Sequence, residues 1–348
     1  MKTCVPVEGA APCAPTAFNW HGLILMSVDI PNYRIVEKLG EGAQTRIFRA
    51  RCMRTGRDYA VKIVKVVRPE DMSFVELLRA EHAIGTSIDH PVIRKLYELR
   101  ILRQRLRTRG AILFMEYVNG ISMADREFRF TLDSLLGLLK QVAQGLHAMH
   151  VAGYVHADLK PNNIMVTADL TVKLIDLGQS SRIREAKPRI QGTIDYMAPE
   201  QAQRGMLDQR TDVFGLGAAL HRVVTGKPVP TEMNQTVSMH SQSLVGKRRD
   251  EIQRPSMEEL PLSVSRLIAD CCKPNPADRI ADMPALIERI DLARTVMSRQ
   301  GIVDPTAAMF ETDENDQDGE PDLSDVISAD LGTIIEDDFD FGAPNAAS

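Results

Sequence analysis

The feature that most constrains this chain is a polar run at 156–163 that is followed by two short apolar segments. The run places a carboxylate at Asp158, an amine at Lys160 and an amide at Asn163. A second carboxylate, Asp176, comes directly after the second apolar segment. We therefore expect two short strands with a polar loop before them and an acidic residue after them. These groups are the oxygen ligands and the cation that a metal-bound phosphate requires.

Residues 33–66 predict an antiparallel sheet, because short Val- and Ile-rich runs are separated by turn residues. In the last run, Lys62 stands among apolar residues, where a charge is costly unless it is paired. A helix predicted over 71–88 offers Glu81 as the partner, with Glu76 as the alternative. We expect strands over 33–39, 46–52 and 58–66, with turns at 40–45 and 55–56.

These segments together resemble the protein kinase family, and in their compact spacing the Ser/Thr protein kinases of bacteria. The run 156–163 resembles the catalytic loop, and 176–178 (Asp-Leu-Gly) resembles the metal-binding turn. Residues 59–62 (Tyr-Ala-Val-Lys) match the strand that carries the ATP-anchoring lysine, and 192–200 contains the Gly-Thr and Ala-Pro-Glu signatures of the activation segment. The resemblance covers 33–299 and implies an α+β, bilobal protein-kinase fold that uses ATP and Mg²⁺ to phosphorylate proteins.

The resemblance also implies a role for each matching residue. Asp158 would orient the substrate hydroxyl, Lys160 would balance charge on the γ-phosphate, and Asn163 and Asp176 would hold Mg²⁺. Lys62 would anchor the phosphates while paired with Glu81. The implied ATP site comprises Leu39, Gly40, Glu41, Gly42, Ile47, Ala60, Lys62, Glu81, Glu116, Val118 and Met165. The implied structural residues around the activation segment are Gly178, Thr193, Glu200, Asp212 and Arg279.

We expect three parts along the chain. Residues 1–32 would form a poorly ordered arm, or a short docking strand, and 33–299 a kinase domain divided into lobes at 33–118 and 119–299. Residues 300–348 would form a disordered tail, because from Asp304 onward the chain has 14 acidic residues and no Lys or Arg. A mixed apolar and acidic stretch at 334–341 is either part of this solubilising tail or a short docking motif.

Composition bounds the compartment and the partners. The five cysteines form no Cys-x-x-Cys pair, which favours a reducing cytoplasm. No apolar run reaches the roughly 18 residues of a membrane span, so we expect no membrane partner. The net charge is −5, and the part before the tail is only mildly basic, which suits ATP and is not typical of a nucleic-acid-binding protein.

The remaining patterns predict a hairpin and four helices. Arginines that alternate from Arg103 to Arg109 suggest one face of a strand, either a solvated basic face or a docking patch. An apolar stripe from Leu132 to Met149 predicts a long helix that ends at Gly153. Further helices are expected over 212–225, 261–272 and 284–299.

Four departures from the family pattern bear on activity. Thr45 replaces a glycine of the phosphate loop, Leu177 replaces an aromatic residue, and Gly85 suggests a loosely docked helix. Ala157 stands where many kinases have an arginine that reads a phosphorylated activation segment. We therefore expect activity that needs no phosphorylation there. The alternatives are an inactive kinase-like scaffold and a small-molecule phosphotransferase.

Overall fold

The computed structural model describes residues 30–42, 44–187, 192–231, 254–301 and 304–306. The arm was expected over 1–32 and the disordered tail over 300–348, and most of both lies outside the described residues. The described start of the tail is packed, because Asp304 accepts the amide of Leu132 and Thr306 is fully buried, which corrects the expectation of disorder there. Ile30, which was expected to belong to the arm, is 1% exposed and packs with Tyr33 in a core cluster.

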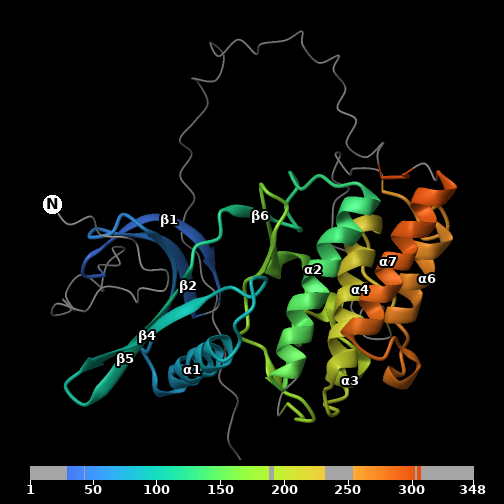
Figure 1. Cartoon of the computed structure of the whole chain (residues 1–348). Helices are drawn as coiled ribbons and strands as arrows, with labels where there is room; N and C mark the ends of the chain where they lie inside the picture. The colour runs from blue at the N-terminus through green and yellow to red at the C-terminus, as the bar shows by residue number, and fades with distance from the viewer. Residues whose placement is uncertain (1–29, 43, 188–191, 232–253, 302–303, 307–348) are drawn as a thin grey trace, which may run out of the picture. The chain divides into compact units, whose positions relative to one another are not determined.

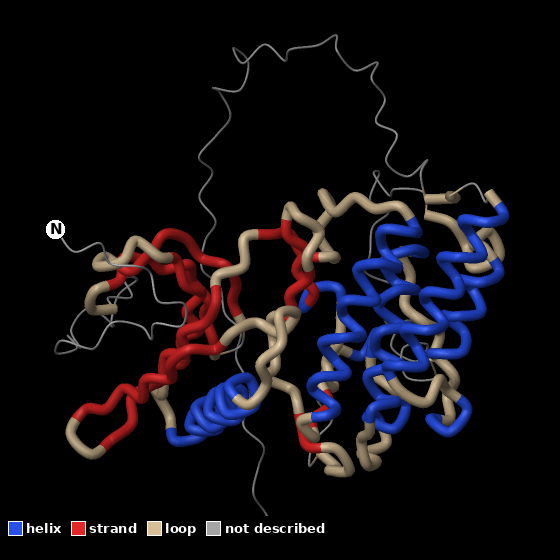
Figure 2. The backbone as a smooth tube through the Cα atoms, in the orientation of Figure 1, coloured by secondary structure: helices blue, strands red, loops and turns tan. Residues whose placement is uncertain are grey.

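An antiparallel sheet and one helix form the N-terminal lobe (Figures 1 and 2). The strand order is β1-β2-β3-β5-β4, and α1 lies beside β4 and β5. The elements are β1 (Tyr33–Glu41), β2 (Thr45–Cys52), β3 (Asp58–Lys65), α1 (Met72–Thr86), β4 (Leu96–Gln104) and β5 (Arg107–Glu116).

Alternation along β3 gives the sheet two apolar faces. Val61 and Ile63 point into one cluster, while Ala60 and Val64 point into the cluster that includes Leu78 of α1. Because side chains alternate in a strand, Lys62 shares the face that α1 covers. The period of the strand thus brings a buried amine next to the helix.

Small and capping residues fix the positions of α1 and the long helix α2 (Leu132–Val151). A Cβ atom on Gly85 would lie 2.4 Å from Cδ1 of Leu96, so the side chain of Leu96 fills the space beside this glycine. The helix is therefore closely packed there, which corrects the expectation of loose docking. At the start of α2, Thr131 and Ser134 form a reciprocal capping box, and Gly153 has a φ of 86° after the helix ends.

Four helices pack around one apolar core in the C-terminal lobe, with a small sheet beside them (Figure 2). The α+β class expected from the sequence is confirmed. The other strands and α-helices in the described part of the chain are β6 (Gly120–Ser122), β7 (Tyr154–Val155), β8 (Ile164–Thr167), β9 (Val172–Leu174), β10 (Ser181–Arg182), α3 (Pro199–Ala202), α4 (Gln209–Thr225), α6 (Leu262–Cys271) and α7 (Met283–Gln300).

Two expectations about the N-terminal lobe are wrong. β1 continues to Glu41, which pairs with Arg46, so the strand extends into the expected glycine turn. The alternating arginines do not share one strand, because the hairpin turns at 105–106: Arg103 belongs to β4, and Arg107 begins β5. Arg105 sits in the turn with a φ of 53°. The predicted arginine face is therefore split between two strands, and β5 continues from Arg107 through its buried residues 110–115.

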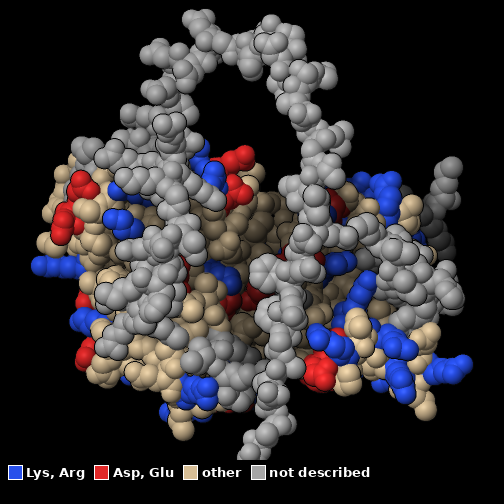
Figure 3. Space-filling view, turned by 180° about the vertical axis from the view of Figure 1, so that it is seen from behind, with Lys and Arg blue, Asp and Glu red and all other residues tan. Residues whose placement is uncertain are grey.

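Charged side chains are spread over the face that Figure 3 shows, with acidic groups among the basic ones. None of the helices in the described part of the chain is both long and apolar enough to cross a lipid bilayer.

Candidate active site

One amine joins three separate elements at the centre of the site. Nζ of Lys62 on β3 lies 2.8 Å from Oε2 of Glu81 on α1, and 3.4 Å from Oδ1 of Asp176, which follows β9. Glu81 is 2% exposed, whereas the alternative partner, Glu76, is exposed and pairs with Arg79. The structure thus brings together Lys62, Glu81 and Asp176.

Burial and charge oppose each other in this cluster. Burial disfavours the ammonium form of Lys62, but the Glu81 and Asp176 carboxylates outweigh it and raise the pKa of Lys62. For Asp176, burial opposes ionisation, but Lys62 and the amide of Gly178 lower the pKa of the carboxyl below its usual value. The lysine is therefore charged and the metal-binding carboxyl candidate is ionised near neutral pH.

The polar run at 156–163 forms a loop that leads from β7 to β8, and its acid and amine face a hydroxyl. Nζ of Lys160 lies 3.0 Å from Oδ2 of Asp158 and donates to Oγ1 of Thr193 at 2.8 Å. Oδ1 of Asp158 accepts from the amide of Thr193 at 2.9 Å and from its hydroxyl at 3.1 Å. A hydroxyl oxygen therefore lies within hydrogen-bond distance of both a carboxylate and an ammonium group.

Asn163 connects the two acidic turns. Its Nδ2 donates to the carbonyl of Asp158 at 2.9 Å, and its own carbonyl accepts the amide of Ile175 at 3.0 Å. Asn163 thus links the loop that contains Asp158 to the segment that leads into Asp176 through two hydrogen bonds.

Asn163 and Asp176 fit a hard cation such as Mg²⁺. The side-chain nitrogen of Asn163 is used within the protein, which leaves its Oδ1 as a candidate ligand. Oδ1 of Asp176 contacts both Lys62 and the amide of Gly178, which leaves Oδ2 as the second candidate ligand. The described residues contain no cluster of three or more His, Cys, Asp or Glu side chains suited to a metal. A Mg²⁺ ion held mainly by nucleotide phosphates needs only one or two protein carboxylates, so the donor set suits that use.

The backbone of the loop is fixed by a buried acid from α4. Asp212 accepts the amides of His156 and Ala157, each at 2.9 Å, and Nε2 of His150 lies 2.8 Å from the same carboxylate. Burial opposes ionisation of Asp212, but the hydrogen bond and charge of His150 outweigh it and lower its pKa. Ala157 has a φ of 58°, so these bonds hold a residue in the left-handed region.

A buried ion pair closes the segment after Thr193. Both guanidinium Nη atoms of Arg279 lie 2.8 Å from the carboxylate of Glu200, and Thr211 donates to the same carboxylate at 2.9 Å. Arg279 is 5% exposed and stacks over the Phe214 ring at 4.9 Å. The structure brings the predicted Glu200 and Arg279 together.

Most of the residues expected around the nucleotide lie in β1, β2 and β3 and at or just after the end of β5, while Glu81 lies in α1 and Met165 in β8. Ile47 pairs with Lys62, Ala60 pairs with Met115, and Met165 pairs with Lys173. Gly42 donates to the carbonyl of Thr45, whose hydroxyl lies only 2.8 Å from where a Cβ of Gly42 would stand. The others are placed as follows: Leu39 is half-exposed, Gly40 pairs with Ile47, Glu41 binds Lys38 and Arg46, Glu116 binds Lys173, and Val118 is buried.

The segment after Gly178 is held by backbone pairing to β7 and by a side-chain hydrogen bond within the segment. Ser181 in β10 pairs with Val155 in β7, and its hydroxyl oxygen is buried. Lys187 donates from its amine to the carbonyl of Gln179. Residues 188–191 of this segment lie outside the described residues.

Some residues at the site were not expected from the sequence. Gln201 donates to the carbonyl of Ala157 at 2.8 Å, and Arg94 donates to the carbonyl of Ile175 at 3.0 Å. The local sequence gives no signal for Arg94, because Lys95 follows it directly, whereas Lys62 stands alone between apolar residues.

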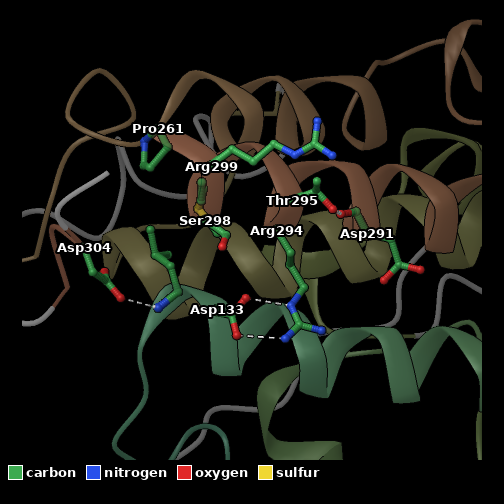
Figure 4. A pocket seen from close by; sticks show the side chains of 10 residues that line it. Asp133, Pro261, Asp291, Arg294, Thr295, Ser298, Arg299 and Asp304 are labelled. Carbon is green, nitrogen blue, oxygen red and sulfur yellow. Dashed lines mark hydrogen bonds and ion pairs between the residues drawn. The ribbon is translucent and has the colours of Figure 1, made fainter. Parts of the chain in front are cut away.

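A separate cavity lies in the C-terminal lobe, away from these groups. It has a volume of about 770 Å³ and lies between the start of α2 and the end of α7 (Figure 4). Arg294 binds Asp133 with two bonds of 2.8 Å beside it, and Asp304 accepts the amide of Leu132 at 2.6 Å. None of the expected site residues lines this cavity.

Comparison with known proteins places the same residues in a family. The protein kinase domain family matches residues 33–289. The chain is 33% identical over 256 residues to "Serine/threonine-protein kinase PknA" of Mycobacterium tuberculosis, covering 71% of this chain and 58% of the relative. It is 30% identical over 272 residues to "Serine/threonine-protein kinase PknB" of the same organism, covering 75% of this chain and 42% of that relative. The match thus spans about half the length of these relatives. The chain contains a protein kinase domain and belongs to the protein kinase family.

Proposed function

We propose that this protein is an ATP-dependent protein kinase that phosphorylates Ser or Thr hydroxyls of other proteins. The observation that carries the proposal is the joining of both acidic turns through Asn163, with Lys62 bound to the second of them. The names of the mycobacterial relatives support Ser/Thr specificity.

In the proposed reaction, the substrate hydroxyl gives its proton to Asp158 while its oxygen attacks the γ-phosphorus of ATP. The bond between that phosphorus and the β,γ-bridging oxygen breaks, and ADP leaves. Lys160 balances the charge on the moving phosphoryl group, and Lys62 holds the other phosphates. Bound Mg²⁺, held by Asn163 and Asp176, would neutralise phosphate charge.

We propose that activity does not depend on phosphorylation of the activation segment. Ala157 offers no cation to read a phosphate, and β10 is held by backbone pairing to β7. The amine of Lys187 supplies a further internal tether. The double variant Ser180→Ala/Ser181→Ala should therefore keep its initial rate within about twofold, and a loss of more than tenfold would contradict this part of the proposal.

The proposed activity is tested by transfer of labelled γ-phosphate from ATP. The purified chain should label a generic basic protein on Ser or Thr, and should not label sugars or aminoglycosides. Labelling of small molecules alone would favour a small-molecule phosphotransferase, and no labelling of either would favour a scaffold.

We also propose a cytoplasmic, signalling role with protein substrates. Cys52, Cys271 and Cys272 are free thiols, which fits a reducing compartment, while Cys4 and Cys13 lie outside the described residues.

A further inference from the structure

A second cation lies behind the Lys62 cluster. Arg94, in the connection between α1 and β4, is 7% exposed, and its Nη1 donates to the carbonyl of Ile175 at 3.0 Å. The same atom lies 3.7 Å from Sδ of Met115. Its Nε is buried without a hydrogen-bond partner, and none of the described carboxylates forms an ion pair with it. An arginine offers five N–H donors, so this one is poorly satisfied for a buried charge.

Such a residue is unfavourable for folding alone. A buried charge without a partner is costly, and an apolar side chain of similar volume in its place is often neutral or stabilising. The carboxylates of Glu81, Asp176 and Glu116 act on Arg94 only from beyond ion-pair distance. Features that violate the rules for a stable core concentrate where function requires them.

The bond made by Arg94 falls on the peptide that leads into Asp176. The amide of Ile175 donates to the carbonyl of Asn163 at 3.0 Å, so Ile175 is held on one side by the loop and on the other by Arg94. The amide of Arg94 donates to the carbonyl of Leu174 at 3.0 Å. The residues directly before Asp176 are thus hydrogen-bonded both to Asn163 in the C-terminal lobe and to Arg94 in the N-terminal lobe.

The hydrogen bonds to Ile175 affect the orientation of the turn at residues 176–178. Oδ1 of Asp176 accepts the amide of Gly178 at 3.1 Å and lies 3.4 Å from Nζ of Lys62. The carbonyl that accepts the bond from Arg94 belongs to the peptide directly before Asp176, so a shift of that peptide would move the Asp176 side chain relative to both partners. The guanidinium also balances the charge of the cluster, because with Lys62 it sets two cations against Glu81 and Asp176.

We propose that Arg94 is a positioning residue that keeps the turn at Asp176 oriented for the metal-bound nucleotide. The inference deepens the proposed function and rests on it for its catalytic consequence. The orientation itself can be measured without any phosphoryl transfer.

The experiment compares Arg94→Met and Arg94→Lys with the wild-type full chain. Arg103→Met is the matched control, because it removes a guanidinium from an exposed position of β4 in the same lobe. The first readout is the hydrogen-exchange rate of the Gly178 amide in nucleotide-free protein. The second is the unfolding temperature, and the third is kcat and KM for ATP.

For Arg94→Met we expect Gly178 to exchange about five- to tenfold faster, which corresponds to the loss of one buried hydrogen bond. Amides in the middle of α2 should exchange at the wild-type rate, and the unfolding temperature should not fall. The value of kcat should fall about tenfold with KM for ATP within about twofold, because Lys62, which Glu81 keeps in place, is unchanged and still holds the phosphates. Arg94→Lys should restore part of the protection, and Arg103→Met should match the wild type.

Unchanged exchange at Gly178 in both Arg94 variants would overturn the inference. So would faster exchange across the whole domain with a lower unfolding temperature, because that pattern marks a purely structural residue. If the wild type transfers no phosphate, the proposed function fails, and the exchange rates still decide whether Arg94 positions the turn.

Discussion

Nζ of Lys62 lies 2.8 Å from the carboxylate of Glu81, and this pair joins β3 to α1. Glu81 is almost fully buried, so water cannot replace Lys62 as the partner of its carboxylate. The pair therefore fixes the position of the amine that the proposed reaction uses to hold ATP.

Replacement of Glu81 should impair nucleotide use far more than replacement of Glu76. Glu81→Gln removes one partner of a buried pair, a loss of about 3 kcal/mol or roughly a hundredfold in kcat/KM for ATP. Glu76→Gln changes a carboxylate on the exposed face of the same helix and should stay within about twofold. Steady-state kinetics of both variants measure the difference, and equal effects would argue against the pair.

Loss of Arg279 should destabilise the C-terminal lobe. Arg279→Ala leaves the carboxylate of Glu200 buried without its cation, which typically costs about 3–5 kcal/mol. Arg289→Ala breaks the exposed pair with Asp270 and should cost less than about 1 kcal/mol. Urea unfolding of the two variants should separate them clearly, and similar midpoints would mean that the buried pair is energetically neutral.

Addition of one methyl group to α1 should be harmful, whereas the same change in α2 should help. Gly85→Ala places a Cβ 2.4 Å from Leu96 and 3.3 Å from Leu177, so we expect a loss of about 1–3 kcal/mol through overpacking. At Gly137 the nearest atom would lie 3.7 Å away, and alanine should add up to about 1 kcal/mol through helix propensity. Thermal unfolding gives both signs, and a neutral Gly85→Ala would show that Leu96 moves without cost.

Acid should destabilise the fold partly through His156. Burial lowers the pKa of His156, opposed by the carboxylates of Asp212, Asp158 and Asp176 and reinforced by the amine of Lys187. The unfolded chain therefore takes up a proton near pH 6.5 that the folded protein rejects, so stability falls as the pH decreases from about 6.5 toward the lower folded-state value.

His156→Phe removes this proton uptake and should flatten the decline of the unfolding free energy between pH 6.5 and 5. At pH 7.5 the variant's free energy of unfolding should differ from that of the wild type by less than it does at pH 5. The reason is that Nε2 of His156 has no hydrogen-bond partner and Nδ1 accepts only a 3.3 Å bond from the Asp158 amide. Denaturant titrations across this pH range provide the measurement, and parallel curves for both proteins would contradict the assignment.

The strands and helices with a strong apolar period could be predicted from the sequence. The stripe on α2 and the alternation on β3 indicate which residues face the core, because burial depends on a local repeat. The prediction that the arginines share one strand is wrong, because alternation of residue types does not show where a strand turns. The turn places Arg105 in the left-handed region, where glycine is usual, so the sequence contains no glycine that would have indicated the turn.

The site was predictable where a charge stands out from an apolar run or belongs to a known motif. Lys62 and Asp158 fall in this class. Contacts between distant segments, such as Gln201 with the carbonyl of Ala157, depend on tertiary packing and leave no local pattern. Arg94 stands beside Lys95 in the sequence and its partner is a backbone carbonyl, so no side-chain pattern reveals its position.

The most direct test of the proposed mechanism compares nucleotide binding with phosphoryl transfer in Asp158→Asn. We predict that this variant binds ATP with Mg²⁺ as the wild type does, because Lys62, Asn163 and Asp176 are unchanged. We also predict that transfer of the γ-phosphate to a protein falls about 10²- to 10⁴-fold, the usual contribution of a group that accepts a proton. Transfer at the wild-type rate by Asp158→Asn would contradict the central claim.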